Sequence, residues 1–168
     1  MKCSVVYSSL TGNTAQLAQQ IKTALGEDCL LCSPIKELTA PPEGLIFVGY
    51  WTDKGSCDEA TAEFLMGLHN ANVAFFATCG AGSGESYYET IHKNAAKYLN
   101  SDCTLVGTFM CQGKMGPGVL KRYQQILEKD PQNPHILAAI QNYEQALPHP
   151  DEKDLADAAA FAKKIAQA

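Results

Sequence analysis

The feature that most constrains the fold of this chain is the alternation of short, continuously apolar segments with longer segments of helical periodicity. The apolar segments hardly alternate between apolar and polar residues, which is typical of strands buried on both faces of a parallel sheet. Such strands, joined by short loops to helical segments, predict a doubly wound α/β fold. The five predicted strands are Lys2–Ser8, Cys29–Cys32, Leu45–Tyr50, Val73–Thr78 and Thr104–Met110.

The number and connection of these segments favour one topology. Because βαβ crossovers are right-handed, five strands joined by helices favour the strand order 2-1-3-4-5. One helix is enough to cover the sheet after the fifth strand, so we expect a single domain over residues 1–168 with a C-terminal helical addition at about residues 131–168. The predicted helices are Asn13–Leu25, a helix capped by Ser56 with Glu59 in a capping box and ending near His69, Glu85–Leu99, Val119–Lys129, Pro134–Leu147 with its proline at the first position, and Asp151–Gln167 capped by Asp151.

Composition excludes several classes of function. The chain of 168 residues is 46% apolar and carries 18 acidic against 13 basic residues, a net charge of -5. A mildly acidic chain offers no electrostatic footprint for nucleic acid or for an anionic membrane. No segment approaches the length of a membrane span, and Met1–Tyr7 lacks the apolar run of a signal peptide, so we expect a cytoplasmic protein.

Cysteine usage indicates a reducing compartment. The chain has seven cysteines, an odd number, whereas a secreted protein of this size would pair its thiols. Cys29 and Cys32 form the only CxxC pair, but residues three apart in a strand point to opposite faces. We therefore expect buried apolar thiols, with neither a disulfide nor a metal site.

The loop after the first predicted strand has the composition of a phosphate site. Ligands of open α/β sheets bind at the carboxyl ends of the strands, near the switch in strand order. Gly12 permits a tight turn, and the free N–H groups of the following helix suit an anion. Four hydroxyl or amide side chains surround this glycine; helix capping alone is the alternative, but one such residue would be enough for it. The predicted phosphate-binding residues are Ser9, Leu10, Thr11, Gly12, Asn13 and Thr14.

This loop, as part of one longer stretch, and three other stretches carry a resemblance to a known family. Ser9-x-Thr11-Gly12-Asn13-Thr14 after a first strand resembles the phosphate loop of the flavodoxin family. The wider pattern is similar to a flavodoxin-domain subgroup of anaerobic and gut bacteria that includes a component of the bacterial bilirubin reductase system. The resemblance implies a flavodoxin-like fold, FMN as cofactor, and a redox role with a partner reductase in the reduction of bilirubin or another pigment. The other stretches that carry it are Tyr7–Thr14, Gly49–Gly55, Gly107–Met115 and Pro148–Glu152.

The loop after the third predicted strand contains the only tryptophan. Trp51 follows a buried strand at the ligand end of the sheet, where its planar side chain can stack on an isoalloxazine ring. The alternative is that Trp51 only covers the edge of the core. Gly55 accepts positive φ readily and so permits a redox-linked backbone flip. The predicted cofactor-binding residues of this second loop are Trp51, Thr52, Asp53, Lys54 and Gly55, of which Asp53 and Lys54 can equally be solvated turn residues.

The loop after the fourth predicted strand is rich in glycine, which lets backbone N–H groups approach the pyrimidine edge of a flavin. It has no aromatic residue of its own, since Tyr87 and Tyr88 fall in the next helix, and one face of the flavin is expected to stay open. The segment Cys111–Gly118 lies beside this third loop and is either a flexible connector or a docking or substrate element, with Lys114 as its one charge. The predicted cofactor-binding residues here are Thr78, Cys79, Gly80 and Gly82.

Three functions are compatible with this pattern. The first is an FMN-binding electron carrier or reductase subunit that supplies a partner reductase; the second is a stand-alone NAD(P)H-dependent FMN or quinone reductase; the third is a flavin-free scaffold or regulatory module. No second nucleotide motif is present for the second function, and Trp51 with the phosphate loop disfavours the third. No side chain is expected to act as an acid or base, because the four histidines are predicted to lie on helices or in the C-terminal tail, away from the three loops: His69, His92, His135 and His149.

Overall fold

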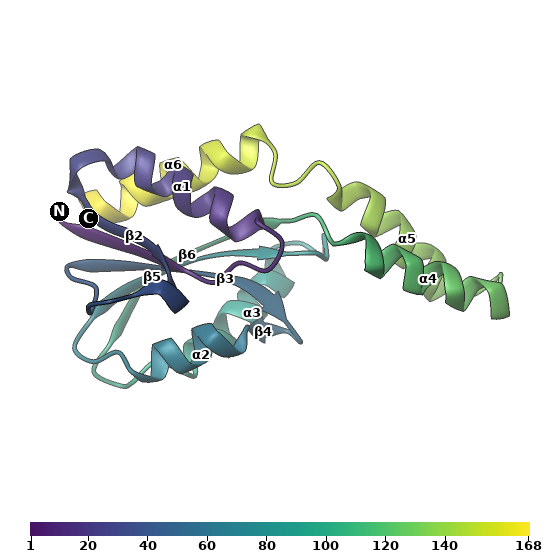
Figure 1. Ribbon diagram of the computed structural model, residues 1–168, viewed down its shortest axis with the longest axis horizontal. Coiled ribbons are helices and arrows are strands. Elements are labelled where there is room, and N and C mark those ends of the chain that lie inside the picture. Colours follow the sequence, from purple (N-terminus) through teal and green to yellow (C-terminus); the bar gives the residue numbers. More distant parts are fainter.

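The computed structural model describes residues 1–168 and is built on one twisted parallel sheet (Figure 1). Its strands lie in the order β2-β1-β3-β5-β6, which confirms the predicted order 2-1-3-4-5 of the parallel strands. A short sixth strand, β4, pairs antiparallel with β3 at the edge where the parallel strands end. The strands are β1 (Cys3–Tyr7), β2 (Cys29–Pro34), β3 (Leu45–Asp53), β4 (Ser56–Cys57), β5 (Asn72–Cys79) and β6 (Thr104–Gln112).

Both faces of the sheet are covered by helices, which explains the continuously apolar strands. The helices α1 (Asn13–Leu25) and α6 (Glu152–Gln167) lie on one face, and α2 (Glu59–Met66) and α3 (Glu85–Ala96) lie on the other (Figure 1). Successive residues of β3 divide between the two cores: Phe47 packs with the α1 side and Val48 with the α2 side, and both are fully buried. A residue on either face is therefore inside the protein, as a parallel sheet requires.

Two helices do not cover the sheet. The helices α4 (Pro117–Lys129) and α5 (Pro134–Ala146) form a hairpin that projects beyond the carboxyl ends of the strands, while α6 turns back to lie beside α1 (Figure 1). No residue of α4 is buried, and α5 buries only Tyr143 and Ala146. The sequence placed the added helices at about residues 131–168; in space the projecting part is residues 117–146, because α6 is the helix that covers the sheet.

The start of α2 differs from the prediction. Ser56 does not cap this helix, because β3 continues past Tyr50 and turns back through β4, which takes up Ser56. Asp58 is the cap instead: its carboxylate accepts hydrogen bonds from the Thr61 N–H at 3.3 Å and the Thr61 hydroxyl at 2.8 Å. The helix ends at Met66 rather than near His69.

The predicted starts at Pro134 and Asp151 are confirmed, whereas α4 starts at Pro117, two residues before the predicted Val119. Pro134 occupies the first turn of α5, whose N-cap Asn133 accepts from two backbone N–H groups. Asp151 caps α6 and forms a capping box with Asp154.

All seven cysteines are free, and burial raises the pKa of the Cys57 thiol to about 11. None of the helices combines the length and the apolar character that crossing a bilayer demands.

Candidate functional site

A cavity of about 590 Å³ opens where β1, β3 and β5 end. This edge of the sheet includes the predicted switch point, which lies between β1 and β3. Its size lies within the range of small-molecule and cofactor sites, roughly 300–1,000 Å³. Gly12 and Asp53 line a neighbouring cavity instead, and Gly82 lines neither. The remaining twelve predicted site residues all line the first cavity: Ser9, Leu10, Thr11, Asn13, Thr14, Trp51, Thr52, Lys54, Gly55, Thr78, Cys79 and Gly80.

The first loop presents the start of α1 to this cavity. Gly12 is the N-cap residue with φ 90°, a left-handed conformation that favours glycine, and it has no side chain to cap the helix. The Ser9 hydroxyl accepts a hydrogen bond from the Ala15 N–H at 3.2 Å, which satisfies one of the free donors of the first turn. The N–H groups of Asn13 and Thr14 precede the first intrahelical bond and stay available, so this end of the helix can receive an anion.

Two polar side chains of the first loop point inward rather than toward a ligand. The Thr14 hydroxyl lies 3.0 Å from the Thr78 hydroxyl, and both residues are buried. Asn13 is 6% exposed, and its Nδ2 donates to the Lys114 carbonyl at 2.8 Å, whereas its Oδ1 has no hydrogen-bond partner. Thr14 thus joins the first loop to β5, and Asn13 joins it to the segment after β6.

The second loop is a tight β-hairpin. Lys54 and Gly55 have φ 48° and 76°, the two positive φ values that a type I′ turn requires, and Asp53 pairs with Ser56 across it. The Gly55 carbonyl accepts from Asn94 Nδ2 at 2.9 Å, so this peptide is tied to α3. Gly55, for which the sequence analysis predicted a backbone flip, therefore lies in a turn, and its carbonyl is held by α3.

Trp51 lies in β3, just before this turn, and separates two cavities. Its side chain is half-buried and lines both the cavity described above and a larger neighbour of about 840 Å³. Next to Trp51, Thr52 donates its hydroxyl to the Thr78 carbonyl at 2.9 Å, which holds the ends of β3 and β5 together. The indole is thus supported by the sheet and still has open space on both sides.

The glycines of the third loop make room for protein atoms. A Cβ at Gly80 would lie 2.8 Å from the Met115 side chain, and one at Gly82 would lie 3.1 Å from the Gln112 carboxamide. The Tyr88 hydroxyl donates to the Ala81 carbonyl at 3.2 Å. The loop is consequently packed against the segment that leads into α4, beside which the sequence analysis had placed it.

Several residues that line the cavity were missed by the sequence analysis. The segment after β6 and the first turns of α4 form one wall, and Tyr87 and Tyr123 place aromatic side chains there although the third loop has none. Residues 113–116 belong to the segment that the sequence left as either a connector or a docking or substrate element, and they were not among the predicted cofactor-binding residues. The lining by α4 has no signal in the sequence, because it follows from the projection of this helix. The missed lining residues are Ala81, Tyr87, Gly113, Lys114, Met115, Gly116, Val119, Arg122 and Tyr123.

The two cavities beside Trp51 differ in charge. The charged residues that line the first cavity are Lys54, Lys114 and Arg122, and no carboxylate lines it. The larger neighbour is lined by four carboxylates and a single lysine, Lys36. Burial raises the pKa of the Cys79 thiol at the first cavity, so this thiol stays neutral. The first cavity therefore suits an anionic ligand, and its neighbour does not.

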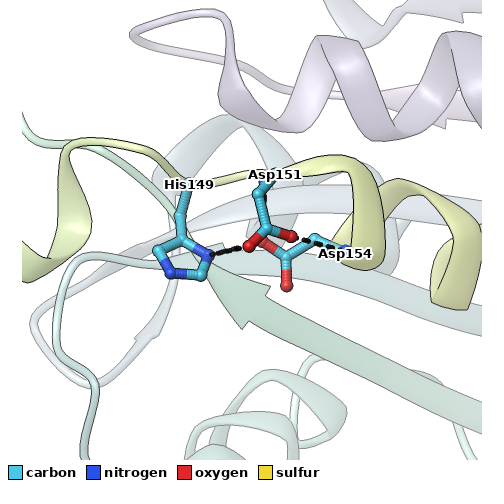
Figure 2. Close-up of side chains that lie close together, drawn as sticks. All are labelled: His149, Asp151 and Asp154. Atoms are coloured by element: carbon cyan, nitrogen blue, oxygen red, sulfur yellow. Dashed lines mark hydrogen bonds and ion pairs between the residues drawn. The ribbon is translucent and has the colours of Figure 1, made fainter.

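The side chains of His149, Asp151 and Asp154 lie close together at the start of α6 (Figure 2). His149 Nδ1 lies 2.6 Å from Asp154 Oδ2, which also accepts the Asp151 N–H at 2.8 Å. The His149 carbonyl accepts from the Lys114 N–H at 2.8 Å. The backbone of His149 thus helps to hold the Lys114 segment, and its side chain lines neither cavity. His92 is buried and lies 2.6 Å from the Tyr50 hydroxyl, behind the site.

Comparisons with known proteins agree with this architecture. A family model described as the flavodoxin domain matches residues 4–163. Two curated relatives are both named flavodoxin-like domain-containing protein BilS. The one from Clostridioides difficile (strain CD3) is 35% identical over 98% of this chain and 96% of its own length, and the one from Clostridium symbiosum (strain WAL-14163) is 37% identical over 93% and 91%.

Among solved structures, the flavodoxin of Streptococcus pneumonia TIGR4 superposes with a TM-score of 0.59 at 12% identity and covers 99% of both chains, a likeness of fold. The family model matches almost the whole length of the chain, and both curated relatives are more than 30% identical to it. This chain belongs to the flavodoxin domain family.

Proposed function

We propose that this protein binds FMN in the cavity beside Trp51 and transfers electrons to a partner reductase. The observation that carries the proposal is the combination, in one cavity, of the uncapped start of α1, a half-buried tryptophan and a carboxylate-free lining. Members of the flavodoxin family bind FMN, which carries a terminal phosphate and a planar ring system. The start of α1 suits the phosphate and Trp51 suits the ring.

The first loop contains one orphaned buried atom. Asn13 Oδ1 is buried without a partner, and its amide cannot be turned around because Nδ2 is committed to the Lys114 carbonyl. A buried acceptor without a donor costs about 1–3 kcal/mol. Asn13 Oδ1 faces the interior rather than the cavity, so the fit of FMN rests on the free N–H groups of Asn13 and Thr14 and on the cationic lining of the cavity.

Bound FMN supplies the capacity to accept and release one or two electrons, and the chain supplies the binding site. The backbone N–H groups of Asn13 and Thr14, with the Thr11 hydroxyl, bind the phosphate. Trp51 packs against the ring, and Lys54, Lys114 and Arg122 make the surroundings favourable for added negative charge. No side chain of the cavity has to carry a proton, which agrees with a protein whose role is to pass electrons on.

The phosphate assignment is tested by comparing FMN with riboflavin, which lacks the phosphate. We expect the wild-type protein to bind FMN more tightly than riboflavin. Thr11→Ala should weaken FMN binding by about 0.5–1.5 kcal/mol, the value of one lost hydrogen bond, and leave riboflavin binding unchanged. Both affinities can be measured by flavin fluorescence. Equal affinity of the wild type for the two flavins would contradict the assignment of the first loop.

The role as a carrier is supported by the α4–α5 hairpin, which projects beyond the carboxyl ends of the strands (Figure 1). The first turns of α4 line the cavity. Residues 114–127 contain three basic residues and no acidic one, although the whole chain is acidic. The hairpin also exposes Ile126 and Leu137. Over its whole length the hairpin is neutral, with three basic residues against Glu128, Asp130 and Glu144, but its stretch beside the cavity is basic. This stretch, with the exposed apolar residues, suits docking of a partner protein that presents an acidic surface.

The curated relatives are named BilS, and we propose that the electrons serve the reduction of bilirubin or another pigment by this partner. A stand-alone reductase would need a site for a nicotinamide dinucleotide. The neighbouring cavity of about 840 Å³ is the obvious space for it, but its four carboxylates would repel the pyrophosphate. The test is pigment reduction by NAD(P)H with this protein alone and with a candidate partner reductase; full turnover by the isolated protein would replace the carrier role.

A further inference from the structure

One side chain of the projecting hairpin reaches back to the third loop. Asn142 of α5 accepts a hydrogen bond at Oδ1 from the Gly82 N–H at 2.9 Å, and its Nδ2 donates to the Gly80 carbonyl at 3.0 Å. The carboxamide therefore satisfies a donor and an acceptor of the same loop. A carboxylate can only accept and an apolar side chain can do neither, so this contact depends on an amide side chain.

Gln112, the last residue of β6, completes the contact. Its Nε2 donates to the Gly80 carbonyl at 3.0 Å and lies 3.3 Å from Asn142 Oδ1. Gly82 lets the two carboxamides come this close, since a Cβ there would meet the Gln112 carboxamide at 3.1 Å. We refer to Gly80, Gly82, Gln112 and Asn142 as the amide clamp.

The amide clamp holds a loop that lines the cavity, and two of its side chains lie outside the cavity lining. Gly80 lines the cavity, whereas Gln112 and Asn142 do not. The Gly80 carbonyl, bound by two amide donors, is thus directed away from the space that a ligand would fill. Asn142 directly precedes Tyr143, one of the two buried residues of α5, so the clamp lies where the hairpin joins the body of the protein.

We propose that Asn142 is a positioning residue for the flavin, and that the α4–α5 hairpin is a structural part of the cofactor site. This inference rests on the proposed binding of FMN. By holding the Gly80 carbonyl outward, the clamp keeps a negative dipole end away from the ring. A reduced flavin is richer in electrons than an oxidised one, so the clamp favours the reduced form more strongly.

The test uses Asn142→Leu, which removes both hydrogen bonds, and Asn142→Asp, which keeps the acceptor for Gly82 and loses the donor to Gly80. Gln141→Leu, at the exposed neighbouring position of α5, is the matched control. We expect Asn142→Leu to weaken FMN and riboflavin by the same factor, about tenfold, because both flavins share the ring. Thr11→Ala changes the ratio of the two affinities instead, so the two sites are told apart.

The midpoint potential gives the second readout. If Asn142→Leu weakens reduced FMN tenfold more than oxidised FMN, the two-electron potential falls by about 30 mV. Asn142→Asp should lower the potential as well, since it adds a negative charge beside the same carbonyl, whereas Gln141→Leu should leave it unchanged. Circular dichroism and thermal unfolding establish that each variant is folded.

Hydrogen exchange of the Gly82 amide reports the clamp without any cofactor. Exchange should be slow in the wild type and in Asn142→Asp, and fast in Asn142→Leu. Wild-type flavin affinity and potential in a folded Asn142→Leu variant whose Gly82 exchanges fast would overturn the positioning role and leave the proposed function standing. Failure of the wild-type protein to bind FMN would overturn both.

Discussion

At the scale of single residues, the first loop uses its polar side chains in an unexpected way. Asn13 and Thr14 belong to the motif that suggested a phosphate site, yet their side chains bond to Lys114 and Thr78 inside the protein. In the proposed FMN complex, the phosphate is then left to the backbone N–H groups and the Thr11 hydroxyl. The motif therefore places the start of α1 at the cavity, and it also bonds the first loop to the end of β5 and to the segment after β6.

Trp51 provides a direct signal of ligand binding, because it is the only tryptophan and lines the cavity. We expect FMN to quench most of its fluorescence. Trp51→Ala should weaken FMN about tenfold through the loss of aromatic packing, whereas Trp51→Phe should keep most of the affinity. Titration of apoprotein with FMN, followed by indole emission, measures both effects. Unchanged emission at saturating FMN would contradict contact between the indole and the flavin.

His92 makes the stability of the fold depend on pH. Burial lowers the pKa of His92 to about 4 from an ordinary value of 6.5, and its Nδ1 lies 2.6 Å from the Tyr50 hydroxyl. Between these values the unfolded chain binds the proton and the folded chain does not. The free energy of unfolding should therefore fall by about 3 kcal/mol as pH falls from 6.5 to 4.

Urea unfolding of the wild type and of His92→Phe between pH 4 and pH 7 measures this contribution. His92→Phe costs stability at pH 7, since it leaves the buried Tyr50 hydroxyl without its partner, but it should remove most of the slope. His135→Phe, at an exposed position of α5, should keep the slope of the wild type. Equal slopes in the wild type and His92→Phe would exclude His92 as the source.

At the scale of elements, the β3–β4 hairpin shapes the second loop. A type I′ turn at Lys54 and Gly55 folds the chain back after Trp51, and Asn94 of α3 ties the Gly55 carbonyl down. The indole therefore sits on a paired strand rather than on a free loop. This arrangement fixes the position of the Trp51 side chain beside the cavity.

Replacing the turn glycine tests the contribution of this hairpin. Gly55 has φ 76°, and no atom lies within 4 Å of the place that a Cβ would take. Gly55→Ala should thus lower the free energy of unfolding by about 1–2 kcal/mol through backbone strain alone. The control is Gly118→Ala in the first turn of α4, which is equally open but has no positive φ and should not destabilise the protein. Urea unfolding compares them, and a Gly55→Ala variant as stable as the wild type would contradict the strained turn.

At the scale of the whole molecule, charge and shape are distributed unevenly. The body carries most of the acidic residues, while the basic stretch 114–127 lies on the hairpin and the wall of the cavity. The hairpin projects from the ligand end of the sheet, and both chain termini lie at the opposite end (Figure 1). A protein bound to the hairpin would consequently lie close to the proposed FMN site.

Charge reversal on the hairpin tests this docking surface. Lys121→Glu with Lys129→Glu should raise the KM for the partner reductase about tenfold at low salt and reverse the salt dependence, with FMN binding unchanged. Lys163→Glu with Lys164→Glu, at exposed positions of α6 near the C-terminus, makes the same change of charge far from the hairpin and should have little effect. Equal KM values for the two double variants would remove the hairpin as the docking surface.

The sequence by itself determined the parallel sheet, its strand order and the loops that bear the site. Continuous apolar runs such as Leu45–Tyr50 can only be buried on both faces, and a short polar loop with Gly12 before a helix predicts an open helix start. Most of the predicted site residues consequently line the cavity. These features depend on local patterns, which a single sequence displays directly.

The tertiary structure alone decided how the remaining residues meet. The bond from Asn13 to Lys114 spans 101 residues, and the bond from Asn142 to Gly80 spans 62. The projection of α4 and α5, the aromatic wall from Tyr87 and Tyr123, and the capture of Ser56 by β4 likewise depend on contacts between distant segments. Periodicity identifies a helix and the face it buries, but it does not specify which other segment that face will contact; this is settled only when the whole chain packs.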